Sequence, residues 1–219
     1  MIRNKRTFSF GLIILMLAFA PAAMADSITT LTPSGDTYIS TGAQFTNFGT
    51  QQTMLVVGGI PQYTALIQFD LSPLSSVSPS NIIDAQLLVW ATTIGFGSSA
   101  VSLSQVTSPW NESTVTFITQ PTVGGFITQN INLLPGQYSS FDITSLLQSW
   151  LASPSSNFGV SLSPIGNTDI TLATKENSDS NIWPELVVDV YSTVPEPSTM
   201  ILLGVGLGGL ALWRRKTRK

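Results

Sequence analysis

The middle of the chain, residues 26–191, alternates short runs of apolar and β-branched residues with Gly, Pro, Asn and Ser. Short runs bounded by turn-forming residues are typical of the strands of a sandwich or barrel. Several runs alternate apolar and polar positions, so one face points inward and the other meets water. The pattern predicts an all-β sandwich with strands at 28–31, 37–40, 53–57, 64–69, 85–91, 101–106, 115–118, 126–131, 139–141, 159–162, 170–173 and 186–191.

One segment has helical periodicity instead. Apolar residues recur at spacings of three and four from Ile143 to Leu151, which predicts one short amphipathic helix. Asp142 or Thr144 can cap its first turn. We expect its aromatic residue, Trp150, in the core, where the helix closes one end of the sandwich.

The N-terminal end has the pattern of a secretory signal. Residues 1–6 are basic, residues 8–20 are apolar, and Ala23 and Ala25 place small side chains where a signal peptidase reads the chain. Residues 1–25 are therefore predicted to be a signal peptide that is removed during export.

The C-terminal end combines three features. Residues 192–197 form a linker with the motif Pro195-Glu196-Pro197, and residues 198–219 form an apolar, Gly-rich helix followed by a basic tail. The apolar stretch is marginal as a transmembrane helix, and its glycines weaken it. Because positive charge stays cytoplasmic, the middle of the chain is expected outside the inner membrane.

Together these C-terminal features resemble a PEP-CTERM sorting signal. The resemblance implies a Gram-negative bacterium whose exosortase recognises Pro195-Glu196-Pro197, removes the tail, which lies in the inner membrane only transiently, and releases or attaches the protein at the surface. The protein would then lie at the cell surface or outer membrane, or in the extracellular matrix. A one-span anchor behind a proline linker is the alternative.

Charge and composition exclude several classes of protein. Only one basic residue, Lys175, lies outside the first six and last six positions, whereas every acidic residue except Glu196 lies within residues 26–194. A nucleic-acid-binding protein needs a basic face, so no nucleic-acid partner is expected. The chain has no His and no Cys, which excludes a Ser/His/Asp triad, a Cys nucleophile, disulfides and a Cys/His zinc site.

Nine short motifs follow one another in order along the middle of the chain. They are Gly35-Asp36-Thr37-Tyr38, Asn47-Phe48-Gly49, Ala65-Leu66-Ile67-Gln68-Phe69-Asp70-Leu71, Ile83-Asp84-Ala85-Gln86-Leu87, Trp110-Asn111-Glu112-Ser113-Thr114-Val115-Thr116-Phe117 with Pro121, Phe141-Asp142-Ile143-Thr144 with Trp150, Asn157-Phe158-Gly159, Lys175-Glu176-Asn177 and Pro184-Glu185-Leu186.

This order resembles the DNRLRE domain family, also described as disaggregatase-related and partly classed among carbohydrate-binding modules. The resemblance spans residues 36–191 and implies a jelly-roll-like β-sandwich domain, here residues 26–191, of the kind appended to polysaccharide-active or surface proteins. No catalytic domain accompanies it in this chain, which argues against an enzyme-targeting role.

Lys175 and the acidic Glu176 beside it are expected to form a structural charge cluster. A lone cation among many carboxylates is held near one or more of them, and Glu112 and Asp142 are the candidates. Contact with a ligand is the alternative role. If the cluster is buried, removing the cation costs roughly 3–5 kcal/mol.

Carboxylates without His suit calcium ligation or glycoside hydrolysis. Ca²⁺ takes oxygen ligands, which Asp36, Asp70, Asp84, Asp169 and the 177–181 loop offer, but no spacing matches an ordered calcium loop. The sequence therefore allows a bound Ca²⁺ but assigns no residue as its ligand. Hydrolysis needs two carboxyls about 5–10 Å apart across a cleft. Glu112 with Glu176 is the pair to test, and structural roles for both are the favoured alternative.

Aromatic side chains in loops are the candidates for stacking on sugar rings. Trp90 and Trp110 are expected in the core instead. We expect a non-catalytic surface or matrix protein that binds polysaccharide, with neutral glycans, or acidic ones through calcium, favoured by the acidic middle. A structural or adhesive matrix component, as in a biofilm, is the alternative, and a polysaccharide-degrading enzyme is less favoured. The sugar-binding candidates are Trp183, which is preferred, and Phe126, Phe96, Phe45 and Tyr138.

Overall fold

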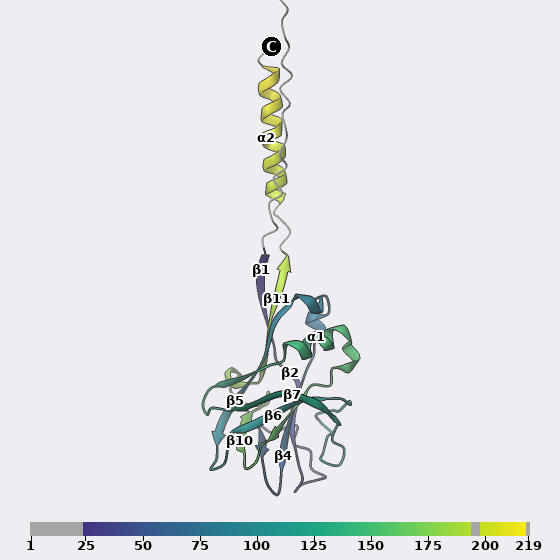
Figure 1. Cartoon of the computed structure of the whole chain (residues 1–219), viewed down its shortest axis with the longest axis vertical. Coiled ribbons are helices and arrows are strands. Elements are labelled where there is room, and N and C mark those ends of the chain that lie inside the picture. The colour runs from purple at the N-terminus through teal and green to yellow at the C-terminus, as the bar shows by residue number, and fades with distance from the viewer. Residues whose placement is uncertain (1–23, 194–197, 218–219) are drawn as a thin grey trace, which may run out of the picture. The chain divides into compact units, whose positions relative to one another are not determined.

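The computed structural model describes residues 24–193 and 198–217 (Figure 1). Residues 25–192 form one compact unit, and the terminal segments form another. The compact unit is mostly β, with antiparallel pairing throughout its principal strands. Its strands are β1 (Met24–Leu31), β2 (Pro33–Ser40), β3 (Thr53–Val57), β4 (Tyr63–Phe69), β5 (Ile82–Ile94), β6 (Ala100–Val106), β7 (Val123–Asn132), β8 (Tyr138–Asp142), β9 (Val160–Pro164), β10 (Asp169–Ala173) and β11 (Glu185–Thr193).

The strands wrap into a β-sandwich-like fold, which confirms the predicted all-β fold class. Their order is β1-β11-β5-β10-β3-β4-β9-β6-β7, with β2 on β4 and β8 on β5. The 13-residue strand β5 links the two parts of the sandwich. Its first half pairs with β11 and β8, whereas its last residues pair with β10.

Every predicted strand except 115–118 overlaps an observed one. That prediction was wrong because residues 107–122 form a looped segment held by local hydrogen bonds. The Val115 N–H donates to the Asn111 carbonyl at 2.9 Å, and the Thr116 N–H donates to the Thr119 hydroxyl at 3.0 Å. Val115 is nevertheless buried, so its apolar character serves packing rather than sheet pairing.

Strands β2 and β4 are covered on both faces. Alternation along a strand sends Tyr38 and Ile67 into the main core, and Ile39 and Leu66 into a second cluster on the opposite side. Val115, from the 107–122 loop, completes that second cluster. The loop therefore acts as a lid over the outer face of β2, and polar side chains on this strand lie in a largely dehydrated environment.

The predicted amphipathic helix is α1 (Thr144–Ala152), which confirms the interpretation of the 143–151 periodicity. It buries Leu146, Leu147 and Trp150 against the core. The Oδ1 atom of Asp142 accepts hydrogen bonds from the N–H and the hydroxyl of Thr144, at 2.9 and 2.6 Å. Asp142 thus satisfies an N–H group at the first turn that has no partner within the helix.

Replacing Asp142 with Ala should lower the free energy of unfolding by about 1 kcal/mol, because the first turn of α1 loses its carboxylate acceptor. Asp142→Asn keeps an acceptor oxygen and should cost less. Urea denaturation of the three proteins measures both differences. An Ala variant as stable as the parent would contradict this role.

The strands next to the chain termini, β1 and β11, are neighbours at one end of the sandwich (Figure 1). Because β11 runs antiparallel to β5, it ends where β5 begins. The loops β3–β4, β5–β6 and β9–β10 lie at the opposite end, since β3, β5 and β9 end there and β4, β6 and β10 start there. The two attachment points of the domain therefore leave from one end, and these loops face the other way.

The C-terminal segment contains α2 (Ser198–Lys216), the predicted apolar helix. Among the described residues, the length and hydropathy of the helices do not reach what a membrane crossing requires, so the predicted span is not confirmed. Residues 1–23 of the predicted signal peptide, with Ala23, and the motif Pro195-Glu196-Pro197 lie outside the described residues, whereas Ala25 lies in β1.

Candidate functional site

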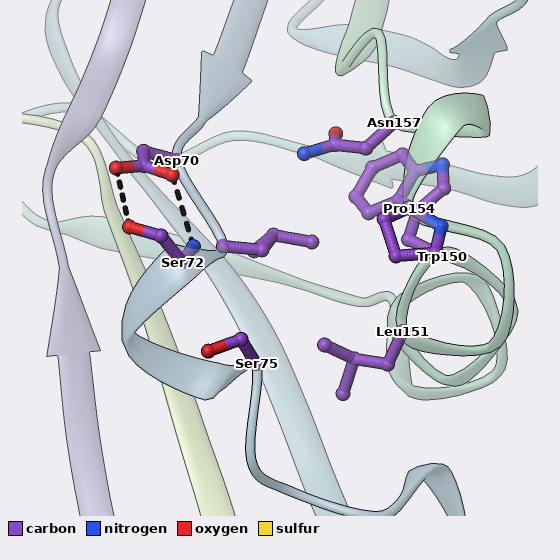
Figure 2. Close-up of a pocket in the computed structure, with 8 residues that line it drawn as sticks. Asp70, Ser72, Ser75, Trp150, Leu151, Pro154 and Asn157 are labelled. Carbon is purple, nitrogen blue, oxygen red and sulfur yellow. Dashed lines mark hydrogen bonds between the residues drawn. The ribbon is translucent and has the colours of Figure 1, made fainter.

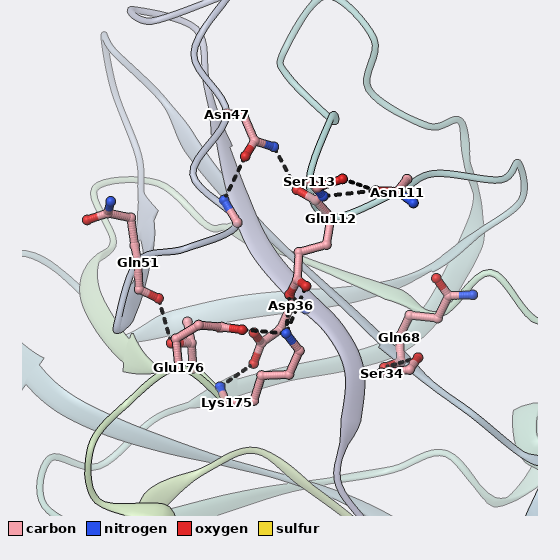
Figure 3. Close-up of polar contacts among 12 residues, drawn as sticks. Ser34, Asp36, Asn47, Gln51, Gln68, Asn111, Glu112, Ser113, Lys175 and Glu176 are labelled. Carbon is pink, nitrogen blue, oxygen red and sulfur yellow. Dashed lines mark hydrogen bonds and ion pairs between the residues drawn. The ribbon is translucent and has the colours of Figure 1, made fainter.

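A cluster of charged side chains gathers around Lys175, between β2, the 107–122 loop and the segment after β10 (Figure 3). The Lys175 ammonium lies 2.7 Å from Glu112 Oε1 and also binds Glu176 Oε1. The backbone N–H of Lys175 donates to Asp36 Oδ2 at 2.9 Å, and the N–H of Asp36 donates to Glu112 Oε1 at 2.7 Å. Four residues from three segments far apart in sequence thus form one network.

Local packing fixes the loop that carries Glu112. The Asn47 amide donates to the carbonyls of Glu112 and Val115, each at 2.7 Å (Figure 3). A Cβ atom at Gly49 would collide with the Glu112 carbonyl, so only glycine allows the two segments to approach this closely. The Trp110 indole N–H donates to the Phe158 carbonyl at 2.8 Å and ties the loop to the turn before β9.

Asp36 is the most buried member of the cluster, with 1% of its surface exposed. The pKa of Asp36 is raised to about 8: burial is the largest cause, the Lys175 N–H opposes it, and the charge and hydrogen bonding of Glu176 add to the rise. Two buried carboxylate oxygens in the cluster, Asp36 Oδ1 and Glu176 Oε2, lack a hydrogen-bond partner among the described residues. A proton held on Asp36 and shared with Glu176 supplies the missing donor.

Lys175 stays charged in this environment. Burial opposes the ammonium form, but the hydrogen bonds and charges of Glu112 and Glu176 outweigh it, so the pKa of Lys175 is raised. With Asp36 protonated, one ammonium faces two carboxylates.

The cluster is also where the described residues could hold a cation. Carboxylate oxygens of Asp36, Glu112 and Glu176 lie within 4.8 Å of one another. However, the Lys175 ammonium already lies among them, and a metal ion would have to displace it. The same geometry does not suit glycoside hydrolysis by Glu112 and Glu176, because both carboxylates bind one ammonium rather than flank a cleft.

Asp142 does not belong to this cluster, which corrects one of the two predicted partners of Lys175. In the described part of the chain, the ion pairs of Lys175 are with Glu112 and Glu176. Asp142 ends β8, opposite Gln86 of β5, and binds Thr144. These hydrogen bonds to Thr144 lower the pKa of Asp142.

The candidate sugar-binding aromatics fall into two groups. Trp183 is half-buried and donates its indole N–H to the Asn177 carbonyl at 2.8 Å. The Tyr138 hydroxyl shares its one proton between the carbonyls of Asn181 and Trp183, at 2.8 and 2.9 Å, and its ring meets Trp90 edge-on at 5.1 Å. These two residues therefore brace the loop before β11.

Phe45 and Phe96 make up the second group and project from loops with 82% and 110% of their surface exposed. The side chain of Phe126 lies outside the described residues. Trp90 and Trp110, which were expected in the core, are both half-buried. Trp110 packs against the second core cluster.

A cavity of about 300 Å³ lies between the segment after β4 and the end of α1 (Figure 2). Asp70 at its rim is already bonded to Ser72, at 2.9 and 2.7 Å, and the Asn157 amide donates to the Phe69 carbonyl. These contacts leave few polar groups for a ligand. Sequence patterns gave no signal for the cavity, because the segments that line it meet only through tertiary packing. Its lining residues are Asp70, Leu71, Ser72, Ser75, Trp150, Leu151, Pro154 and Asn157.

Comparison with known proteins gives two matches to families and one to a curated relative. Residues 193–216 match the PEP-CTERM protein-sorting motif, which confirms the predicted sorting signal. A gellan lyase from Bacillus sp. is 29% identical over 199 residues, which cover 88% of this chain but only 8% of that much longer protein. Residues 27–190 match carbohydrate-binding module family 96. The chain therefore belongs to carbohydrate-binding module family 96.

Proposed function

We propose that this protein is a non-catalytic polysaccharide-binding module that an exosortase sorts to the surface or extracellular matrix of a Gram-negative bacterium. The observation that carries the proposal is the succession of a family 96 module and a PEP-CTERM motif along one chain. Within the domain, β11 ends opposite the β3–β4, β5–β6 and β9–β10 loops, which leaves these loops free to contact polysaccharide.

The contacts of the charge cluster argue against catalysis by Glu112 and Glu176. Glu112 and Glu176 are both engaged by Lys175, and Asp36 is buried, so these carboxylates serve the packing of β2 against the 107–122 loop. The lyase name belongs to a relative of which this chain spans only 8%. Its activity is therefore not part of the proposal.

The test is affinity electrophoresis of residues 26–192 in native gels that contain soluble polysaccharides, with an assay for released sugar ends and unsaturated products. We expect one or more neutral polysaccharides to retard the domain without any product. Retardation that EDTA abolishes would place calcium in the binding site or in the fold. Released product would overturn the non-catalytic proposal and make Glu112 and Glu176 the first residues to mutate.

A further inference from the structure

Four loops gather at the end of the sandwich opposite β1 and β11, and we call them the loop tip (residues 41–46, 58–62, 95–99 and 165–168). Phe45, Ile60 and Phe96 lie in three of these loops with 82%, 101% and 110% of their surface exposed. Large apolar side chains that stay this exposed contribute little to the core. Several of them at one end of a domain indicate a surface used for binding.

Backbone hydrogen bonds join the four loops into one frame. The Thr41 N–H donates to the Gln62 carbonyl at 3.0 Å, and the Gly58 N–H donates to the Thr168 carbonyl at 2.8 Å. The Ser98 N–H donates to the Asn167 carbonyl at 3.1 Å and so attaches the Phe96 loop. The three exposed apolar residues are thus carried on loops that are fixed relative to one another, which lowers the entropy lost on binding.

The four loops of the loop tip carry no charged residue, although the exposed Asp169, at the start of β10, lies against Gly95 and Gly97 of the Phe96 loop. These loops present the exposed amides Gln44, Gln62 and Asn167 beside the apolar side chains. Apolar faces that stack on sugar rings, together with amides that bond hydroxyl groups, form the usual chemistry of carbohydrate recognition. A surface without a cation, and with the Asp169 carboxylate at its edge, fits a neutral glycan better than a polyanion, which the carboxylates repel.

We propose that the loop tip is the polysaccharide-contacting surface of this domain, and that its ligand is a neutral glycan chain stacked on Phe45 and Phe96. This inference rests on the proposed binding function. It extends that function by assigning the surface, by adding Ile60 to the candidate residues, and by placing the contact at the end of the sandwich opposite β1 and β11. It also assigns Trp183 and Tyr138 a structural rather than a binding role.

The test compares residues 26–192 with the double variant Phe45→Ala/Phe96→Ala and with Tyr191→Ala, a control that removes an exposed ring from β11 at the opposite end. Each is sedimented with cellulose, xylan, mannan, β-1,3-glucan, gellan and polygalacturonate. We expect a neutral polymer to retain the parent, the double variant to bind it about tenfold or more weakly, and the control to bind normally. Melting curves of all three should coincide.

The outcomes distinguish failure of the loop-tip assignment from failure of the proposed polysaccharide binding. A parent domain that is retained equally with its double variant would overturn the loop tip as the contact surface and leave polysaccharide binding intact. A parent retained by polygalacturonate without calcium, and by none of the neutral polymers, would overturn the assignment of a neutral ligand. A parent that no polymer retains would overturn the proposed function, and the loop tip with it.

Discussion

Replacing Lys175 with Met should lower the melting temperature of the domain by about 6–12 °C. The change leaves Glu112 and Glu176 facing each other without their cation, beside the buried Asp36. The ion pairs are half-buried, with 20–24% of each side chain exposed. The expected cost is therefore at the low end of the range for breaking a buried pair, about 3 kcal/mol, and a domain of this size shifts by about 2–4 °C per kcal/mol. Differential scanning calorimetry of residues 26–192 measures the shift.

Two further variants make this result specific to the cluster. Ser155→Asp makes the net charge more negative by the same amount as Lys175→Met, but at an exposed site. It should melt within about 1–2 °C of the parent. Combining Lys175→Met with Glu112→Gln and Glu176→Gln removes the uncompensated carboxylates and should recover part of the loss. An unchanged melting curve for Lys175→Met would show that the network contributes nothing to stability.

Replacing Asp36 with Asn should remove the dependence of the melting temperature on pH between about pH 5 and 8. Asp36 has its pKa raised from 3.8 to about 8 in the folded domain, first by burial and then by Glu176. In this window the folded state therefore binds a proton that the unfolded state has released. The contribution of Asp36 to the free energy of unfolding is therefore fully present near pH 4 and is lost as pH rises through 8.

The Asn side chain imitates the protonated acid, because its amide donates toward Glu176 at every pH and its oxygen still accepts from the Lys175 N–H. The parent should melt at progressively lower temperatures from pH 5 to 8, whereas Asp36→Asn should stay level. Asp26→Asn, an exposed site on β1, serves as the control and should keep the slope of the parent. If the parent itself melts at one temperature across the range, the proton shared between Asp36 and Glu176 is excluded.

Much of the fold could be predicted from local sequence because the strands are short and punctuated. Alternation identified β11, whose Leu186, Val188 and Val190 are all buried, and a spacing of three and four identified α1. The failure at 115–118 has a physical cause. The Asn111 side-chain oxygen accepts hydrogen bonds from the Ser113 N–H and hydroxyl and starts a turn. The β-branched residues that follow therefore lie in a loop and pack against the core without pairing in a sheet.

The site was less predictable, because sequence gives the number of charges but not the distances between them. Lys175 was expected to meet carboxylates, yet nothing local distinguishes Glu112, which binds it, from Asp142, which binds Thr144. The pairing of Asp36 with Glu176 depends on a strand covered on both faces, a property of the tertiary structure. The glycines on either side of Phe96 indicated an exposed loop position. No local pattern indicated that the indole N–H of Trp183 donates to the Asn177 carbonyl.

The most direct test of the central claim is equilibrium co-sedimentation of the folded domain, residues 26–192, with insoluble polysaccharides, including matrix isolated from an exosortase-bearing bacterium. The account predicts saturable retention that soluble oligosaccharides of the same glycan compete away, with no sugar released into the supernatant. Retention on none of these polymers, from a domain that melts cooperatively, would contradict the claim that this protein binds polysaccharide.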